Sequence, residues 1–174
     1  MRQTSSRWCV TFLFLLLSAR TPAQRVPMLH VGGAGIQTVE LSAKDLAEMT
    51  RLSVDVVEPH HGETQHYEGV RLSDLLAMAG VPLGDKLRGS VMAMYVLAHA
   101  SDGYAVVYSV AEIDPAMNDN RIIVADKMNG KPLEPKEGPF KIVVPDDKRP
   151  ARWIRMLTAL SVEKAINPSE SSPR

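Results

Sequence analysis

A basic segment near the C-terminus is the strongest candidate for chemistry in this sequence. Residues 148–152 read Lys-Arg-Pro-Ala-Arg, and Trp153 follows them directly. A guanidinium is a planar fork of N–H donors that binds phosphates and other oxyanions through two hydrogen bonds at once. Arg149 and Arg152 are therefore candidate anion ligands. The alternative is a solvated loop whose charges offset the two aspartates before it; it stays open for Arg152 and is favoured for Lys148.

Three histidines form a second candidate, for a metal ion. His60, His61 and His66 follow the pattern His-His-x4-His, and imidazole is a common ligand of zinc, copper and iron. Adjacent residues of a strand point to opposite faces, so His60 and His61 could share one ion only from an irregular loop. Glu58 and Glu63 are near, but no carboxylate completes a recognised metal motif. We favour an exposed polar loop and predict no metal site.

Asp102 and Tyr104 could act as a general acid or base. Nothing in the sequence pairs either of them with a partner, and Asp is common in turns because its side chain accepts from the backbone two residues on. We therefore favour an aspartate that forms a turn. Ser109 and the other serines have no nucleophile-elbow context. No catalytic residue is assigned from the sequence.

The elements that would position these groups are mainly strands. Apolar or alternating runs predict strands at residues 27–31, 36–41, 52–56, 64–70, 91–98, 103–109, 121–125, 140–144 and 153–162. The first two flank a glycine-rich turn, and those at 91–98 and 103–109 flank a polar turn, so each pair predicts a hairpin. Asn129-Gly130 is a strong turn dipeptide between two further strands.

Short helices are interleaved with these strands. Ser42 and Asp45 resemble a capping box with Asp in place of Glu, so a helix should follow Ser42. Residues 72–79 have helical spacing, with Ser73 as the expected N-cap and Gly80 at the C-terminal end. Residues 110–114 suggest one helical turn. The pattern predicts an α+β fold, a single domain with a mixed β-sheet core.

Several short segments in this order resemble a known family. Residues 67–76 match the pattern Tyr/Trp-x-Gly-Val-x-Leu-x-x-Leu-Leu. Asn-Gly-Lys-Pro-Leu at 129–133, Glu-Gly-Pro-Phe at 137–140, Val-Val-Pro at 143–145 and Arg152-Trp153 follow. Together they resemble the molybdopterin-binding domain of the sulfite-oxidase family. The resemblance implies that family's fold and allows a molybdopterin cofactor. It also implies that the segment bearing Arg149, Arg152 and Trp153 faces the cofactor site, so these three are the predicted cofactor-binding residues.

The sequence departs from the family at two positions that matter for chemistry. In the family's enzymes, the cysteine that ligates molybdenum follows the strand that corresponds to residues 52–57. Here residues 58–67 connect that strand to the next motif, and none of them is cysteine. The family's His-Gly is Glu137-Gly138 in this chain, and an added carboxylate would repel an anionic pterin phosphate.

The first 23 residues have the features of an export signal. Arg2 and Arg7 precede an apolar run of ten at residues 8–17, too short for a transmembrane helix, and small residues up to Ala23 resemble a cleavage site. A membrane anchor or a buried helix is the less favoured alternative. We predict a signal peptide at 1–23, a molybdopterin-oxidoreductase-like domain at 24–166 and a disordered tail at 167–174, in a periplasmic or secreted protein.

Cleavage after residue 23 would change both cysteine content and charge. The single cysteine, Cys9, would be lost, which excludes disulfides and thiolate ligands in the mature chain. Three arginines and no acidic residue would go with it, leaving 17 basic and 20 acidic residues, a net charge of −3. That charge argues against nucleic acid and anionic membranes as partners, and no remaining segment predicts a membrane span.

Three functions are compatible with the sequence. We favour a catalytically reduced relative of the molybdopterin oxidoreductases that binds a small anionic ligand or a periplasmic protein partner, without a bound cofactor. The alternative is an active molybdopterin-dependent oxidoreductase whose metal is held by the pterin dithiolene alone, with no protein thiolate. A third hypothesis, an assembly partner that pairs through sheet edges, cannot be separated from the first by sequence.

Overall fold

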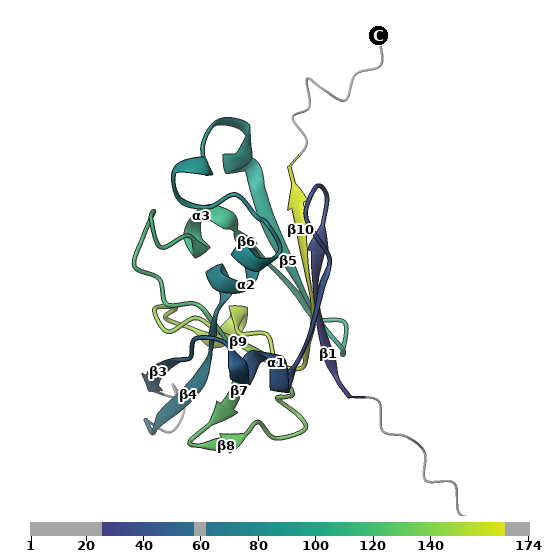
Figure 1. Cartoon of the computed structure of the whole chain (residues 1–174). Helices are drawn as coiled ribbons and strands as arrows, with labels where there is room; N and C mark the ends of the chain where they lie inside the picture. The colour runs from purple at the N-terminus through teal and green to yellow at the C-terminus, as the bar shows by residue number, and fades with distance from the viewer. Residues whose placement is uncertain (1–25, 58–61, 166–174) are drawn as a thin grey trace, which may run out of the picture.

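The computed structural model describes residues 26–57 and 62–165, in which two five-stranded sheets enclose short helices (Figure 1). One sheet, called here the mixed sheet, has the order β2-β1-β10-β5-β6. Its strands are β1 (Met28–Gly33), β2 (Val39–Ser42), β5 (Met94–Ala100), β6 (Ala105–Ser109) and β10 (Leu157–Lys164). The pair β1–β10 is parallel and the other neighbours are antiparallel. The predicted α+β class with a mixed sheet is confirmed.

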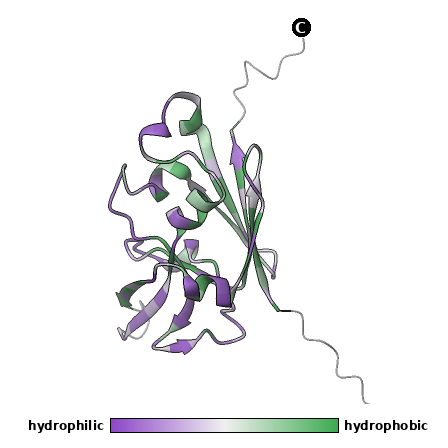
Figure 2. Cartoon of the chain, in the orientation of Figure 1, coloured by the Kyte–Doolittle hydropathy of each residue, from purple (hydrophilic) through white to green (hydrophobic). Residues whose placement is uncertain are grey.

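The second sheet, called here the antiparallel sheet, carries most of the candidate site. It has the order β3-β4-β7-β8, and β9 also pairs with β7. Its strands are β3 (Leu52–Val57), β4 (Thr64–Arg71), β7 (Ile123–Met128), β8 (Lys131–Pro132) and β9 (Lys141–Val143). Its two faces differ because side chains alternate along a strand. Hydrophilic residues predominate along β4 and β8 (Figure 2).

Two hydrophobic clusters lie on opposite faces of the antiparallel sheet. The larger one joins Val70, Val124 and Ile142 to the inner face of the mixed sheet and to the helix α2 (Leu72–Met78). The smaller one lies on the other face and includes Val56, Tyr67, Val143 and, partly buried, Trp153. The smaller cluster therefore forms a second apolar layer, and the candidate site lies on it.

The helices begin where local sequence satisfies their backbone. In α1 (Ala43–Glu48) the predicted capping box of Ser42 and Asp45 is present in both directions. The helical turn α3 (Val110–Ile113) has a second capping box, made by Ser109 and Glu112. Each box satisfies N–H groups that the first helical turn leaves without partners.

The N-cap predicted for α2 (Leu72–Met78) was wrong. The helix begins at Leu72, directly after β4, and Ser73 is a buried residue of its first turn. The N–H of Leu72 donates to the carbonyl of Ile122, the residue before β7, at 3.0 Å, so a long-range backbone hydrogen bond replaces a side-chain cap. Gly80 ends the helix as predicted, with a φ of 85° in the left-handed region that favours glycine.

Three strands begin three or four residues later than predicted, and one of them is β2, which begins at Val39 instead of residue 36. The strand expected from residue 91 begins at Met94, because a 3-10 helix, η2 (Gly89–Ala93), precedes it. The strand expected from residue 153 begins at Leu157, after the 3-10 helix η3 (Pro150–Arg152) and a left-handed residue, Met156, with a φ of 51°. Before β10, Trp153 packs against the smaller cluster and Ile154 belongs to the larger one, although neither residue is in a strand.

Some predictions fall on residues that the structure does not describe. They are the signal peptide at 1–23, the tail at 167–174, and the pair His60 and His61. Within the described residues, no helix combines the length and the apolar character that a membrane crossing requires.

Candidate functional site

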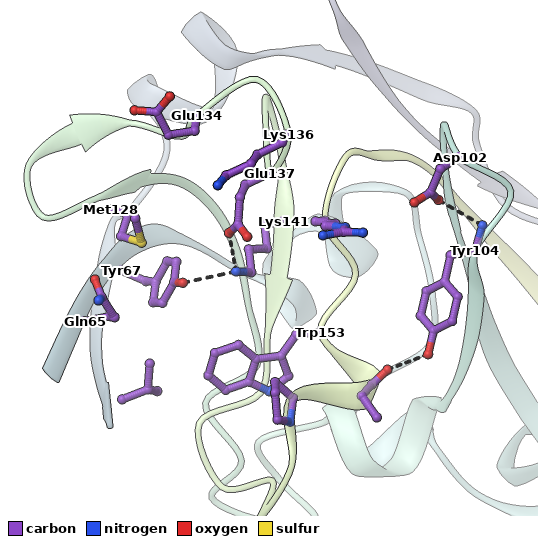
Figure 3. Close-up of a pocket in the computed structure, with 14 residues that line it drawn as sticks. Gln65, Tyr67, Asp102, Tyr104, Met128, Glu134, Lys136, Glu137, Lys141 and Trp153 are labelled. Carbon is purple, nitrogen blue, oxygen red and sulfur yellow. Dashed lines mark hydrogen bonds and ion pairs between the residues drawn. The ribbon is translucent and has the colours of Figure 1, made fainter. Parts of the chain in front are cut away.

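An open cleft of about 710 Å³ lies against the face of the antiparallel sheet that bears the smaller cluster (Figure 3). Three other segments complete its wall: the β5–β6 turn, the loop after β8, and the segment from η3 to β10. Its lining consists of Val56, Gln65, Tyr67, Asp102, Tyr104, Met128, Glu134, Lys136, Glu137, Lys141, Pro150, Ala151, Trp153 and Arg155.

Lys141 is the most unusual residue of this cleft, because it is a lysine only 8% exposed. Its Nζ forms an ion pair with the carboxylate of Glu137 and donates a hydrogen bond to the hydroxyl of Tyr67 at 3.1 Å. The same nitrogen lies 4.9 Å from the ring centroid of Tyr67 and 5.8 Å from that of Trp153. A buried ammonium is costly unless it is paired and hydrogen-bonded, and these contacts meet that requirement.

The sheet explains why this lysine faces the cleft. Along β9, Lys141 and Val143 share one face, and Ile142 between them faces the larger core. Lys141 pairs with Ala125 of β7, and Tyr67 of β4 pairs with Met128 of the same strand. Two residues 74 positions apart are therefore brought together by the shared neighbour β7.

Glu137 does not have the uncompensated charge that the sequence suggested. Its carboxylate contacts the Nζ of Lys141, and its side chain is 24% exposed. Its backbone carbonyl accepts from the N–H of Met156 at 2.7 Å, which joins this loop to the segment before β10. A carboxylate paired with a lysine repels a bound anion less than an isolated one does, so the predicted repulsion is reduced here.

Tyr67 and Trp153 form the aromatic part of the wall. Their ring centroids lie 6.1 Å apart with an interplanar angle of 88°, an edge-to-face pair. The indole Nε1 of Trp153 donates to the carbonyl of Val144 at 2.9 Å, which fixes the ring. Such pairs prefer this geometry because the positive edge of one ring meets the negative face of the other.

Arg152 is bound by carboxylates of its own chain. Its Nε and Nη2 donate to Asp147 at 2.9 and 2.7 Å, and its Nη1 donates to both oxygens of Glu112 at 3.2 and 3.1 Å. Its guanidinium carbon lies 5.4 Å from the ring centroid of Tyr108. The hydrogen bonds to Asp147, followed by those to Glu112, raise the pKa of Arg152 above its ordinary value.

The three predicted cofactor-binding residues thus occupy different environments. Trp153 lines the cleft, whereas Arg149 and Arg152 are not among its lining residues. Arg149 is exposed. The peptide segment between them, Pro150 and Ala151, does line the cleft, so Arg152 and its carboxylates hold a wall in place. A direct contact between either arginine and a ligand stays a prediction.

Asp102 forms the predicted turn. Its Oδ1 accepts from the backbone N–H of Tyr104 at 3.0 Å, two residues on. The hydroxyl of Tyr104 donates to the carbonyl of Ala151 at 2.7 Å, which ties the β5–β6 turn to the opposite wall. Both residues line the cleft, and both have these structural contacts.

His66 lies on β4 opposite Asp55 of β3, and its Nδ1 is 2.5 Å from the Oδ1 of that aspartate. Both side chains are exposed, at 46% and 67%. Within the described ranges, 26–57 and 62–165, no three side chains of histidine, cysteine, aspartate or glutamate lie close enough together to hold a metal ion.

Sequence reasoning did not single out Lys141 or Tyr67, and it considered Glu137 only as a departure from the family. One signal was present: Lys141 interrupts the apolar run at 140–144. A charged residue inside a strand that is buried on both sides requires a partner. The identity of that partner depends on contacts that only the fold creates.

Comparison with known proteins agrees with this architecture. A family model described as oxidoreductase molybdopterin binding domain matches residues 23–170. Among solved structures, the sulfane dehydrogenase SoxCD from Paracoccus pantotrophus superposes with a TM-score of 0.59 at 18% identity, over 78% of this chain and 38% of that one. That likeness shows the fold, and the chain spans well under half of the longer protein. No curated protein matches. Because the family model covers most of its length, this chain belongs to the oxidoreductase molybdopterin binding domain family.

Proposed function

We propose that this chain is an exported, catalytically reduced member of its family that binds a small organic anion with a flat, apolar body. The observation that carries the proposal is the buried ammonium of Lys141, which lies beside the rings of Tyr67 and Trp153 in the cleft. Export rests on the N-terminal sequence pattern alone.

The charges along the cleft support an anionic ligand. Lys136 and Arg155 line it together with Lys141, and neither forms an ion pair with another residue in the described part of the chain. Of the three carboxylates on the wall, Glu137 is compensated by Lys141, Asp102 accepts a backbone N–H, and Glu134 is exposed. Exposed cations with no partner steer and hold an anion better than cations that are already paired.

The apolar surface supports a flat ligand body. Tyr67 and Trp153 present ring surface, and Val56, Met128 and Pro150 add aliphatic contacts. Small-molecule sites are typically mostly apolar, occupy about 300–1,000 Å³ and contain a few placed polar groups. The cleft, at about 710 Å³, has the size and composition of such a site.

The lining residues do not fit the molybdenum cofactor of the family's enzymes. Those enzymes ligate the metal through a cysteine thiolate, and the described residues contain no cysteine. Lys141 is paired with Glu137 and Arg152 lies outside the lining, so of the lining residues only the exposed Lys136 and Arg155 offer unpaired cations to a pterin phosphate. The exposed Glu134 adds negative charge to the same wall. No reaction step through a molybdenum centre is therefore derived for this chain.

Calorimetric titration with naphthalene-2-carboxylate tests this function, with the corresponding primary amide as the neutral control. We expect the carboxylate to bind with one site per chain and the amide to bind at least about tenfold more weakly, because only the carboxylate forms charge-assisted hydrogen bonds. Binding of neither compound, or equal binding of both, would contradict the proposal.

Three lysine and arginine variants locate the anion. Lys136→Ala should weaken binding of the carboxylate, because Lys136 lines the cleft. Lys86→Ala is the matched control, an exposed lysine of η1 (Gly84–Lys86) outside the cleft. If Arg149→Ala abolishes binding instead and Lys136→Ala does not, the anion binds at the basic segment that the sequence indicated.

A further inference from the structure

We propose that the hydroxyl of Tyr67 and the ammonium of Lys141 are paired donors for the carboxylate of the ligand, and that Glu137 restricts this subsite to monoanions. The inference rests on the proposed function, since it names the atoms that would hold the anion. Figure 3 shows the Nζ of Lys141 between the hydroxyl of Tyr67 and the carboxylate of Glu137.

Lys141 and Tyr67 each have one donor hydrogen for which the described residues supply no acceptor. An ammonium has three N–H donors. One of those of Lys141 is directed to Glu137 and a second to the Oη of Tyr67. No acceptor for the third lies within the described residues. Because the Oη of Tyr67 accepts from Lys141, its own hydrogen must point elsewhere, and no described residue accepts it.

The two donor atoms that carry these hydrogens lie next to each other in the wall of the cleft. The Nζ and Oη atoms are 3.1 Å apart, and both residues are among those that line it. Two adjacent donors suit the two oxygens of one carboxylate, or a single oxyanion held by both. A hydrogen bond with ionised partners is shorter and stronger than a neutral one, so a carboxylate is preferred over an amide.

The donors are held in place before the ligand binds. Tyr67 is 4% exposed, lies in the middle of β4 and packs edge-to-face with Trp153. Lys141 is 8% exposed and is fixed by Glu137. Side chains that are already ordered lose little conformational entropy on binding, which favours affinity.

Glu137 sets the charge of this subsite. Its carboxylate neutralises the ammonium of Lys141, so the local charge is close to zero before the ligand binds. A monoanion then gains two hydrogen bonds with little net repulsion. A phosphate dianion meets the Glu137 carboxylate with twice the charge, and the repulsion between like charges rises in proportion.

Four variants and two probes of the same shape test the inference by calorimetry. The probes are naphthalene-2-carboxylate and 2-naphthyl phosphate. Tyr67→Phe removes one donor and should weaken carboxylate binding about tenfold, since the anion loses one hydrogen bond. Tyr95→Phe, on β5 and outside the cleft, is the matched control and should bind as the wild type does.

The other two variants test the ion pair. Glu137→Gln should strengthen binding of the phosphate probe by about tenfold or more relative to the carboxylate, because a like charge is removed. Lys141→Met alone leaves Glu137 without its partner and could unfold the chain. The double variant Lys141→Met/Glu137→Gln avoids that, and it should lose carboxylate binding while its thermal unfolding stays cooperative.

The outcomes distinguish a failure of the paired donors or of the selectivity from a failure of the proposed function. Wild-type protein that binds the carboxylate, with Tyr67→Phe and the double variant binding equally well, overturns the paired donors and leaves the proposed function intact. A Glu137→Gln variant with unchanged preference between the probes overturns the selectivity. Wild-type protein that binds neither probe overturns the proposed function itself.

Discussion

Replacing Arg152 by alanine should destabilise the fold. The guanidinium donates four hydrogen bonds to two carboxylates, at 2.7 to 3.2 Å, and stacks on Tyr108. The three side chains are partly exposed, with 36% for Arg152, 27% for Glu112 and 19% for Asp147. This places the two ion pairs between the exposed and the buried extremes.

The expected loss follows from that exposure. Exposed ion pairs contribute about 0.2–1 kcal/mol each, and bidentate pairs with restricted side chains lie at the upper end. We assign about 1 kcal/mol to each of the two pairs after screening by solvent, or about 2 kcal/mol in total. A domain of this size loses about 3 °C in melting temperature per kcal/mol, so Arg152→Ala should melt about 6 °C below the wild type.

Thermal unfolding followed by circular dichroism measures this loss, with Arg149→Ala as the matched control. Arg149 is an exposed arginine of the same segment and forms no ion pair within the described residues. Its replacement should shift the melting temperature little. At high salt the difference between the two variants should shrink, because exposed charges are screened. Equal melting of Arg152→Ala and Arg149→Ala at low salt would refute the structural role and restore Arg152 as an anion ligand.

Substitutions at three further positions test other parts of the fold. Met156 has a φ of 51°, so Met156→Gly should be tolerated and Met156→Val should cost about 2 kcal/mol in urea denaturation. The side chain of Ser42 lowers the pKa of Asp45 below its ordinary 3.8. The ionised carboxylate of Asp45 therefore stabilises the folded state above pH 3.8, and this stabilisation is lost as the pH falls through the lowered pKa. The urea midpoints of the wild type and of Asp45→Asn should therefore converge in acid. Gly69→Ala should fail to express as folded protein, because a Cβ would lie 2.1 Å from the carbonyl oxygen of Val124.

Local features of this fold could be predicted from sequence because their causes are local. The capping box at Ser42 and Asp45 involves residues three positions apart. The turn at Asn129-Gly130 depends only on the positive φ angles that these two residues adopt. The hairpins follow from alternation and turn composition in the same way. The N-cap of α2 was missed because the partner of Leu72 is the carbonyl of Ile122, fifty positions away.

The candidate site depends on long-range contacts, so only parts of it could be predicted. Trp153 was identified and lines the cleft. Arg152 was identified as a candidate ligand, but its partner Glu112 is 40 positions away, and a sequence pattern does not reveal such a pair. Tyr67 and Lys141 meet through β7, which neither of their motifs contains. The charge of Glu137 was noted, but its compensation by Lys141 depends on the buried position of that lysine.

The proposed function separates the family fold from the chemistry of the family's enzymes. The antiparallel sheet, its second apolar layer and the segment that bears Trp153 are retained. The described residues contain no cysteine, and the cations at positions 141 and 152 are paired with carboxylates. On the proposed function, the cleft binds a small organic anion, and without a cysteine ligand it does not suit the molybdenum cofactor of the family's enzymes.

Molybdenum content tests this central claim most directly. The full-length protein should be produced in a host supplied with molybdate, purified after export, and analysed for molybdenum by mass spectrometry and for released pterin by fluorescence. A cysteine-containing member of the family from the same host serves as the loaded control. We predict that this chain contains molybdenum and pterin far below one equivalent. One molybdenum and one pterin per chain would contradict the account.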